Sequence, residues 1–336
     1  MAKKRPAKKK PTKTSTPQVT KVKPLPYRAF IGAALILVLV AIVYWLIFKP
    51  FASPQFDGGN AFEQLVKQCD FGSRVPSSEA HRTCGDFLLA ELRRYSDRVS
   101  EQTFTYTDKK DSSRVYRGRN MVASFNLQPE KGYRVMLCAH WDSRPFADKD
   151  PDSSRHADPV PGANDGASGT AVLLEMARVL DAFPPEIGVD IVLFDLEDLG
   201  DYGAEDHPDS LTPFSIGAAY FAAHREQYTP RYGILLDMIG DQDLRIKKEA
   251  YSQAAAPLLM DQIWAAAKTA GATAFIDSTG VAITDDHVPF LRQGIPVVNL
   301  IDFDYPYWHT VADTPDKCSP ASLQQVGDVL VEMIYR

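Results

Sequence analysis

The chain has 336 residues, of which 45% are hydrophobic and 24% charged, a composition typical of a globular protein with a sizeable core. Its formal net charge is −6, but residues 1–28 carry ten Lys or Arg and no acid, which leaves −16 on the rest of the chain. Because nucleic-acid phosphates are bound by basic surfaces, this acidic remainder excludes nucleic acid as an expected partner.

The N-terminal region differs in composition from the rest of the chain. Residues 1–28 are rich in Lys, Pro and Thr and are predicted to form a disordered, basic tail in the cytoplasm. Residues 30–48 carry no charge, and a helix of that length spans roughly 28 Å, close to the hydrocarbon thickness of a bilayer. We therefore predict a transmembrane helix over residues 29–49 that contacts the lipid bilayer through residues 30–48.

The charges beside this span predict its orientation. Excess Lys and Arg before an apolar segment hold the N-terminus in the cytoplasm. The chain is therefore predicted to be a single-pass inner-membrane protein whose remaining residues lie outside the cytoplasm, in the periplasm of a bacterium. A cleaved signal peptide is the alternative, but its apolar region usually has about 7–15 residues, fewer than this run. We favour the uncleaved anchor.

After a Pro- and Gly-containing linker at residues 50–59, the pattern predicts one domain over residues 60–336. Helices are predicted from apolar periodicity, and strands from short apolar runs that end at turn residues. The expected helices cover residues 61–68, 78–95, 166–181, 215–224, 251–270 and 322–334, and the expected strands cover residues 101–107, 115–125, 133–139, 189–194, 232–240, 244–248 and 296–301. Because strands alternate with helices, we expect an α/β fold, a three-layer domain with a mostly parallel, mixed central sheet flanked by helices.

None of the four cysteines lies in a Cys-x-x-Cys metal motif. Cys138 falls in an apolar strand and is expected to be a small core residue. Cys69 and Cys84 are able to pair in an oxidising compartment, but their spacing alone leaves open whether they do.

Polar side chains follow the apolar strands at the places where the strands end. Asp195, Glu197 and Asp198 come directly after the strand at 189–194, where three carboxylates repel one another and are costly to desolvate unless a cation is present. The other polar residues at expected strand ends or at the start of the following helix are His140, Asp142, Asp165, Asp237, Trp308 and His309. A cap on a neighbouring helix explains any one of these residues, but several of them at one edge of the sheet favour a functional site. Mixed His and carboxylate ligands are typical of a catalytic zinc.

Six segments carry a resemblance to a known family. They are HWDSRP at 140–145, GANDGASG at 162–169, FDLED at 194–198, LLDMIG at 235–240, DDHVPF at 285–290 and YWHT at 307–310. In this order and at these separations they resemble the zinc-dependent aminopeptidase superfamily, and within it they look most like the bacterial type of glutaminyl-peptide cyclotransferase. The resemblance covers roughly residues 60–336 and implies a zinc aminopeptidase-like fold with one zinc ion per chain favoured and two possible.

The resemblance also implies roles for individual residues. It implies that Asp165, Asp198 and His309 bind the zinc and that Glu197 is the catalytic acid/base. It implies that the carboxylates of Asp237 and Asp285 hydrogen-bond around this acid/base. It also implies that Trp308 forms a wall of the substrate pocket. His140 and Asp237 match the positions that hold a second zinc in two-metal aminopeptidases. Many relatives have two consecutive Glu where this chain has Glu197 and Asp198, and the shorter Asp is still able to ligate.

The reaction implied is the conversion of an N-terminal glutamine of a peptide or protein to pyroglutamate, with release of ammonia. The alternative enzyme is a membrane-anchored zinc aminopeptidase that hydrolyses N-terminal residues, and a third reading is a non-catalytic binding domain. The sequence favours the cyclase because Asp285 is followed by Asp286 and His287, and because Trp308 directly precedes His309. His287 is expected to orient other groups, whereas His81, His156, His207 and His224 are expected on loops or helix surfaces without a catalytic role.

Overall fold

The protein is described from a computed structural model that covers residues 27–48, 53–96, 98–225 and 228–336. The chain divides into two units, Met1–Ala52 and Ser53–Arg336. Most of the predicted tail lies outside the described residues, as does part of the predicted linker. That linker ends earlier than predicted, because the carboxylate of Asp57 accepts hydrogen bonds from the first turn of a helix that begins at Gly58.

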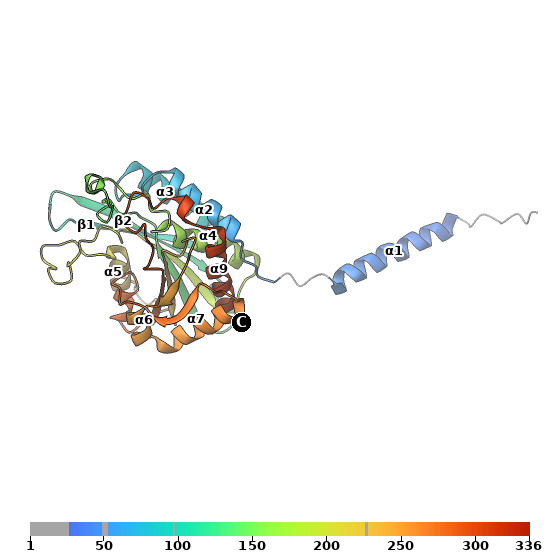
Figure 1. Ribbon diagram of the computed structural model, residues 1–336. Helices are drawn as coiled ribbons and strands as arrows, with labels where there is room; N and C mark the ends of the chain where they lie inside the picture. Colours follow the sequence, from blue (N-terminus) through green and yellow to red (C-terminus); the bar gives the residue numbers. More distant parts are fainter. Residues whose placement is uncertain (1–26, 49–52, 97, 226–227) are drawn as a thin grey trace, which may run out of the picture. The chain divides into compact units, whose positions relative to one another are not determined.

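In the first unit, the described residues form one helix, α1 (Tyr27–Phe48) (Figure 1). This helix confirms the secondary structure expected for most of residues 29–49. Within the part of the chain that the structure describes, no helix has the length and apolarity needed to cross a membrane. That residues 29–49 span a bilayer stays a prediction.

The second unit alternates helices and strands, as predicted. Its strands are β1 (Arg98–Thr107), β2 (Val115–Phe125), β3 (Arg134–His140), β4 (Gly188–Phe194), β5 (Gly233–Asp237), β6 (Ile246–Lys248), β7 (Phe275–Thr279) and β8 (Val297–Ile301). Its α-helices are α2 (Gly58–Asp70), α3 (Glu79–Tyr95), α4 (Ala167–Ala182), α5 (Ile216–Ala223), α6 (Ala250–Ala255), α7 (Pro257–Ala270), α8 (Val288–Leu291) and α9 (Pro320–Tyr335). Two short 3₁₀ helices cover Ser153–Arg155 and Pro315–Lys317.

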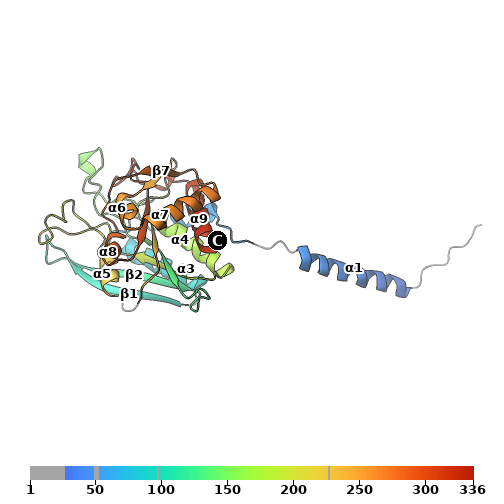
Figure 2. The same ribbon diagram turned by 90° about the horizontal axis from the view of Figure 1, so that it is seen from below.

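The central sheet has six strands in the order β1-β2-β4-β3-β5-β8. Strands β4, β3, β5 and β8 run parallel, whereas β2 pairs antiparallel with both β1 and β4. Of these six strands only β2 therefore runs in the opposite direction, and both antiparallel pairings lie on one side of the sheet, with β1 at its edge (Figure 2). This arrangement confirms the prediction of a mostly parallel, mixed sheet. Strands β6 and β7 form a separate parallel pair.

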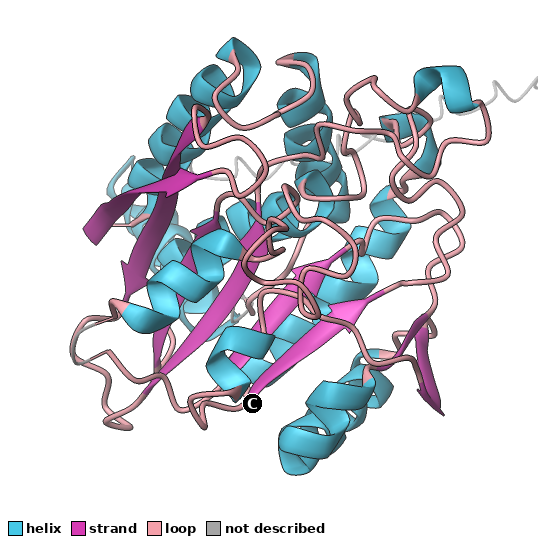
Figure 3. Cartoon of the chain, turned by 90° about the vertical axis from the view of Figure 1, so that its left-hand side faces the viewer, coloured by secondary structure: helices cyan, strands magenta, loops and turns pink. Residues whose placement is uncertain are grey.

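Helices cover both faces of the sheet (Figure 3). Along β3 the side chains alternate: Val135 and Leu137 pack in the core beneath α2, α3, α4 and α9, and Met136 and Cys138 pack on the opposite face with α5 and α8. Helices α2, α4 and α9 lie side by side on the first face (Figure 1). The three-layer α/β architecture is therefore as expected, and Cys138 is a buried core residue.

Two expectations about individual elements are wrong. The helix predicted over residues 251–270 is two helices, α6 and α7, because Pro257 lacks a backbone N–H and begins a new helix. Strand β7 was not expected, because most of its residues are exposed and it shows no apolar run. Cys69 and Cys84 both carry free thiols in this structure.

Candidate metal centre and active site

The predicted site residues gather at the carboxyl edge of the parallel strands. His140 is the last residue of β3 and Asp237 the last of β5. Glu197 and Asp198 follow β4 after a short turn, and Asp165 lies two residues before α4. Because the carboxyl ends of parallel strands meet at one edge, residues far apart in the sequence are brought together there.

Small residues let the backbone that carries Asp165 approach the sheet. A Cβ atom at Gly169 would lie 2.3 Å from the backbone oxygen of Leu236, so the first turn of α4 packs directly against the end of β5. Gly166 has a φ of +93°, and a Cβ atom there would lie 2.3 Å from the backbone oxygen of Asp142. A side chain at either position would displace the turn that presents Asp165.

Two buried aspartates hold the backbone of the ligand-bearing loops. The two carboxylate oxygens of Asp142 accept hydrogen bonds from the backbone N–H groups of Glu197 at 3.1 Å and Asp198 at 3.2 Å. Asp313 accepts in the same way from Asn164 at 2.8 Å and Asp165 at 3.1 Å. Each carboxylate therefore fixes two consecutive backbone amides, and the side chains that follow from them, in one orientation.

The structure brings the three predicted zinc ligands together. The Nε2 atom of His309 lies 3.2 Å from Oδ1 of Asp198 and 3.6 Å from Oδ2 of Asp165. All three residues are buried, and one possible ligand atom from each lies within 4.8 Å of the others. His309 itself has a φ of 53°, an uncommon backbone conformation for a residue other than glycine that is often found at functional sites.

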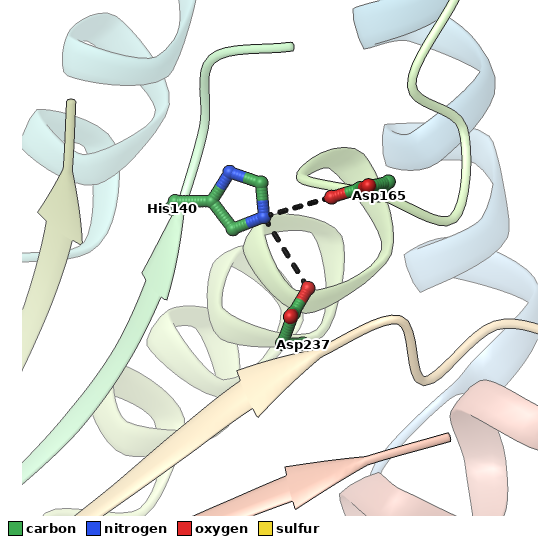
Figure 4. Close-up of side chains that lie close together, drawn as sticks. All are labelled: His140, Asp165 and Asp237. Carbon is green, nitrogen blue, oxygen red and sulfur yellow. Dashed lines mark hydrogen bonds and ion pairs between the residues drawn. The ribbon is translucent and has the colours of Figure 1, made fainter. Parts of the chain in front are cut away.

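A second group shares Asp165 with the first (Figure 4). The Nε2 atom of His140 lies 3.1 Å from Oδ1 of Asp165 and 3.3 Å from Oδ1 of Asp237. Asp165 thus directs one carboxylate oxygen toward His140 and the other toward His309. His140 and Asp237 are the residues predicted as a possible second metal site, and with Asp165 between the two groups the arrangement is able to hold two neighbouring cations.

The buried carboxylates fit a divalent cation. Oδ1 of Asp198 pairs with the guanidinium of Arg144 at 3.3 Å, but its buried Oδ2 has no hydrogen-bond partner among the described residues, which leaves this oxygen available to a metal ion. Burial lowers the pKa of His309, but the nearby carboxylates of Asp198, Asp148 and Asp165 outweigh it and raise that pKa to about 9. A metal ion would replace the proton that these carboxylates now attract to the imidazole.

Glu197, the predicted acid/base, is buried beside this group. Burial, followed by the charges of Asp198, Asp285 and Asp286, raises the pKa of its carboxyl well above the ordinary value, although the charge of His140 opposes the shift. Ser215 donates a hydrogen bond to its Oε1 at 3.3 Å. A carboxyl whose pKa is raised in this way is suited to accept and return a proton near neutral pH.

The relation of Asp237 and Asp285 to Glu197 differs from the expectation. Among the described residues no hydrogen bond joins either carboxyl to Glu197. Asp237 instead pairs with His140, and Asp285 accepts a hydrogen bond from the side chain of Asn299 at 2.6 Å. The charge of Asp285 nevertheless acts on Glu197, because it contributes to the raised pKa of the Glu197 carboxyl.

A cavity of about 890 Å³ opens beside these groups. Its lining includes Glu197, Asp165, Asp237, Asp285 and His309, together with Trp308, the predicted pocket wall. A cavity of this volume is within the range typical of ligand-binding pockets.

Sequence reasoning missed several residues of the site and misplaced one histidine. Tyr202 and Asp313 carry no motif of their own, and only their partners in the fold reveal them, whereas Asp286 lies in the DDHVPF segment but was given no role at the site. His81 is buried, not on a surface, because its Nε2 pairs with Asp195 at 2.8 Å. His287 pairs with Glu249 at 3.2 Å and lies in neither metal group, which is compatible with the expected orienting role.

A buried donor set of this kind at the carboxyl edge of a mixed sheet is characteristic of metal-dependent α/β enzymes. Residues 120–334 match peptidase family M28, and the chain belongs to that family. It is 31% identical over 212 residues to the aminopeptidase YwaD of Bacillus subtilis (strain 168), a match that covers 60% of this chain and 40% of that relative.

Solved structures with a similar fold include two bacterial glutaminyl cyclases. The cyclase of Bacteroides thetaiotaomicron, bound to N-acetylhistamine, is 36% identical with a TM-score of 0.79, and the match covers 85% of this chain and 99% of that chain. The cyclase of Tannerella forsythia is 37% identical with a TM-score of 0.77, covering 84% of this chain and 99% of that chain. These comparisons confirm the resemblance inferred from the motifs.

Proposed function

We propose that the protein is a zinc-dependent glutaminyl-peptide cyclotransferase that converts N-terminal glutamine of peptides or proteins to pyroglutamate. The observation that carries this proposal is the convergence of Asp165, Asp198 and His309 in the wall of a cavity that also contains Glu197. The identity of 36–37% to cyclases whose whole length the chain nearly covers supports it.

Zinc is the metal that this donor set favours. Two carboxylates and one imidazole are ligands of the types found at catalytic zinc sites, where a fourth position stays open for substrate. Bound there by Asp165, Asp198 and His309, zinc supplies a Lewis acid that polarises the γ-carbonyl of the substrate glutamine.

Glu197 moves the proton in this mechanism. The α-amine nitrogen of the substrate forms a bond to its own side-chain carbonyl carbon, and Glu197 accepts the proton that this nitrogen loses. When the bond from that carbon to the amide nitrogen breaks, Glu197 returns the proton to the departing ammonia. Burial raises the pKa of the Glu197 carboxyl well above its ordinary value, so this group holds a proton more readily than an exposed glutamate, which suits the acceptance and return of the proton.

The cavity orients the substrate for ring closure. Trp308 lines the cavity with its ring 4.2 Å from that of His309, and we assign it the wall against which the glutamine side chain packs near the metal. Holding the amine close to the carbonyl carbon makes the attack an oriented intramolecular step.

A zinc aminopeptidase is the second candidate, and the group of His140, Asp165 and Asp237 favours it. That group gives the site donors for two neighbouring cations, as in two-metal aminopeptidases, and the Bacillus relative bears the name aminopeptidase. In this reaction Glu197 would take a proton from an attacking water, and the peptide bond would be cleaved.

One assay separates the two candidates. Full-length protein loaded with zinc is incubated with a Gln-initiated peptide and, separately, with a Leu-initiated peptide of the same length. The cyclase releases ammonia from the first and leaves the second intact, whereas an aminopeptidase releases free amino acid. Glu197→Gln is expected to abolish turnover while zinc stays bound, since the amide cannot accept the proton. Full activity in that variant would exclude the assigned role.

We also propose that residues 30–48 attach the protein to a lipid bilayer with residues 1–28 in the cytoplasm and the catalytic domain in the periplasm. This proposal is based on the sequence pattern of ten cations followed by an uncharged apolar run. Membrane fractionation followed by protease treatment of intact and opened cells tests it. Recovery of the untruncated protein in the cytosolic fraction would contradict it.

A further inference from the structure

Tyr202 connects the metal centre to the wall of the cavity. It lies in the loop between β4 and α5, which also carries Glu197 and Asp198. Its hydroxyl oxygen is 2.6 Å from Nδ1 of His309, a residue 107 positions further along the chain. The tyrosine therefore ties the loop that bears one predicted ligand to the ring of another.

The chemistry of the imidazole defines the direction of this hydrogen bond. Nε2 of His309 faces Asp165 and Asp198, and a neutral ring that ligates through Nε2 carries its hydrogen on Nδ1. Nδ1–H then donates to the oxygen of Tyr202. A partner that accepts this hydrogen fixes the orientation of a metal-bound histidine and makes it a better ligand.

A carboxylate lies near the same nitrogen without taking this position. Oδ1 of Asp148 is 3.6 Å from Nδ1 of His309, which is beyond a hydrogen bond. Both oxygens of Asp148 are instead bound by the guanidinium of Arg144, at 2.8 and 2.9 Å. The phenol of Tyr202 is thus the direct partner of the histidine.

The ring of Tyr202 faces the place where substrate would bind. It lines the cavity, and 45% of the residue is exposed. The ammonium of Lys149 lies 4.3 Å from its centroid, and the ring of Trp308 meets it edge-on at 6.2 Å. The two ends of one side chain therefore have separate contacts, the hydroxyl with His309 and the ring with the cavity.

We propose that Tyr202 is a positioning residue whose hydroxyl holds His309 in place for the metal and whose ring forms part of the surface that binds the substrate glutamine. The second half of this inference rests on the proposed function, whereas the first concerns only metal binding. The two halves make different demands on the side chain, so two substitutions separate them.

Tyr202→Phe removes the hydroxyl and keeps the ring. We expect the zinc dissociation constant of the full-length protein, measured by competition with a fluorescent chelator, to rise about tenfold to a hundredfold. In the zinc-saturated variant, KM for a Gln-initiated peptide should stay within about twofold of the wild-type value. Tyr202→Leu removes both parts of the side chain, so both the zinc dissociation constant and KM should rise.

Tyr251→Phe is the matched control. Tyr251 is similarly exposed, at 46%, and within the described residues its hydroxyl makes no hydrogen bond and it does not line the cavity. Its zinc affinity and KM should equal those of the wild type. Thermal unfolding in the presence of a chelator reports whether each variant is folded.

Zinc affinity in Tyr202→Phe equal to that of the control would overturn the role of the hydroxyl. If Asp148→Asn weakens zinc binding and Tyr202→Phe does not, Asp148 and not Tyr202 is the residue that positions His309. Unchanged KM in Tyr202→Leu would overturn the role of the ring. The zinc titration needs no turnover, so it tests the hydroxyl independently of the proposed function. If the wild-type protein fails to cyclise glutamine, the proposed function is refuted. If Tyr202→Phe still lowers zinc affinity in that case, the role of the hydroxyl stands.

Discussion

Replacing Asp142 with asparagine tests how the metal-bearing loop is held. Each oxygen of this fully buried carboxylate accepts one backbone N–H, from Glu197 and from Asp198. Asparagine keeps one acceptor and presents an NH₂ group to the other amide, which leaves that buried N–H without a partner. Such a group costs about 1–3 kcal/mol.

The expected effect is therefore a loss of about 1–3 kcal/mol in the free energy of unfolding, measured by urea denaturation in the presence of a chelator. The turn that carries Glu197 and Asp198 should also shift, so zinc affinity should fall. Asp152→Asn is the control: Asp152 accepts from Ser154 in an exposed turn, and its replacement should change stability by less than about 0.5 kcal/mol. Wild-type stability and zinc affinity in Asp142→Asn would refute this account of the loop.

Three further predictions follow from the site and its surroundings. Burial and the charge of Asp285 raise the pKa of Asp286, so the folded chain holds a proton that the unfolded chain releases above about pH 4, and stability falls as pH rises. In urea denaturation, the free energy of unfolding of Asp286→Asn should therefore exceed that of the wild type at pH 8 but not at pH 4. An equal difference between the two proteins at both pH values would contradict the raised pKa. Gly169→Ala should lose about 1–3 kcal/mol in the same assay, because its Cβ would meet the oxygen of Leu236 at 2.3 Å, and wild-type stability would show that the helix is free to move. Zinc at a hundred times its dissociation constant should raise the free energy of unfolding of the metal-free protein by about 2.7 kcal/mol, and no rise would argue against a native metal site.

The residues that could be predicted from the sequence are those whose position depends on strand ends. His140 and Asp237 end apolar strands, and Glu197 and Asp198 follow one directly. Since parallel strands finish at one edge, their convergence follows from the α/β pattern before any coordinates are known. His309 follows a loop after β8, and its place among the ligands depended on the resemblance to a family.

The residues that could not be predicted act through contacts across loops. Tyr202 reaches His309 only because the loop after β4 folds back over the site, and no local pattern encodes that path. Asp286 looks in sequence like its neighbour Asp285, yet it is fully buried and its two oxygens have no partner among the described residues. Because proline has no backbone N–H, Pro257 indicates a break between two helices. The apolar periodicity continues across this break, which is why one helix was predicted.

The central claim is that Asp165, Asp198 and His309 bind one divalent cation beside Glu197. Anomalous diffraction at the zinc absorption edge, from crystals of the zinc-loaded protein, tests it most directly. We predict a peak about 2.0–2.2 Å from an oxygen of each aspartate and from Nε2 of His309. A zinc peak elsewhere in the protein, with these three side chains uncoordinated, would contradict the claim.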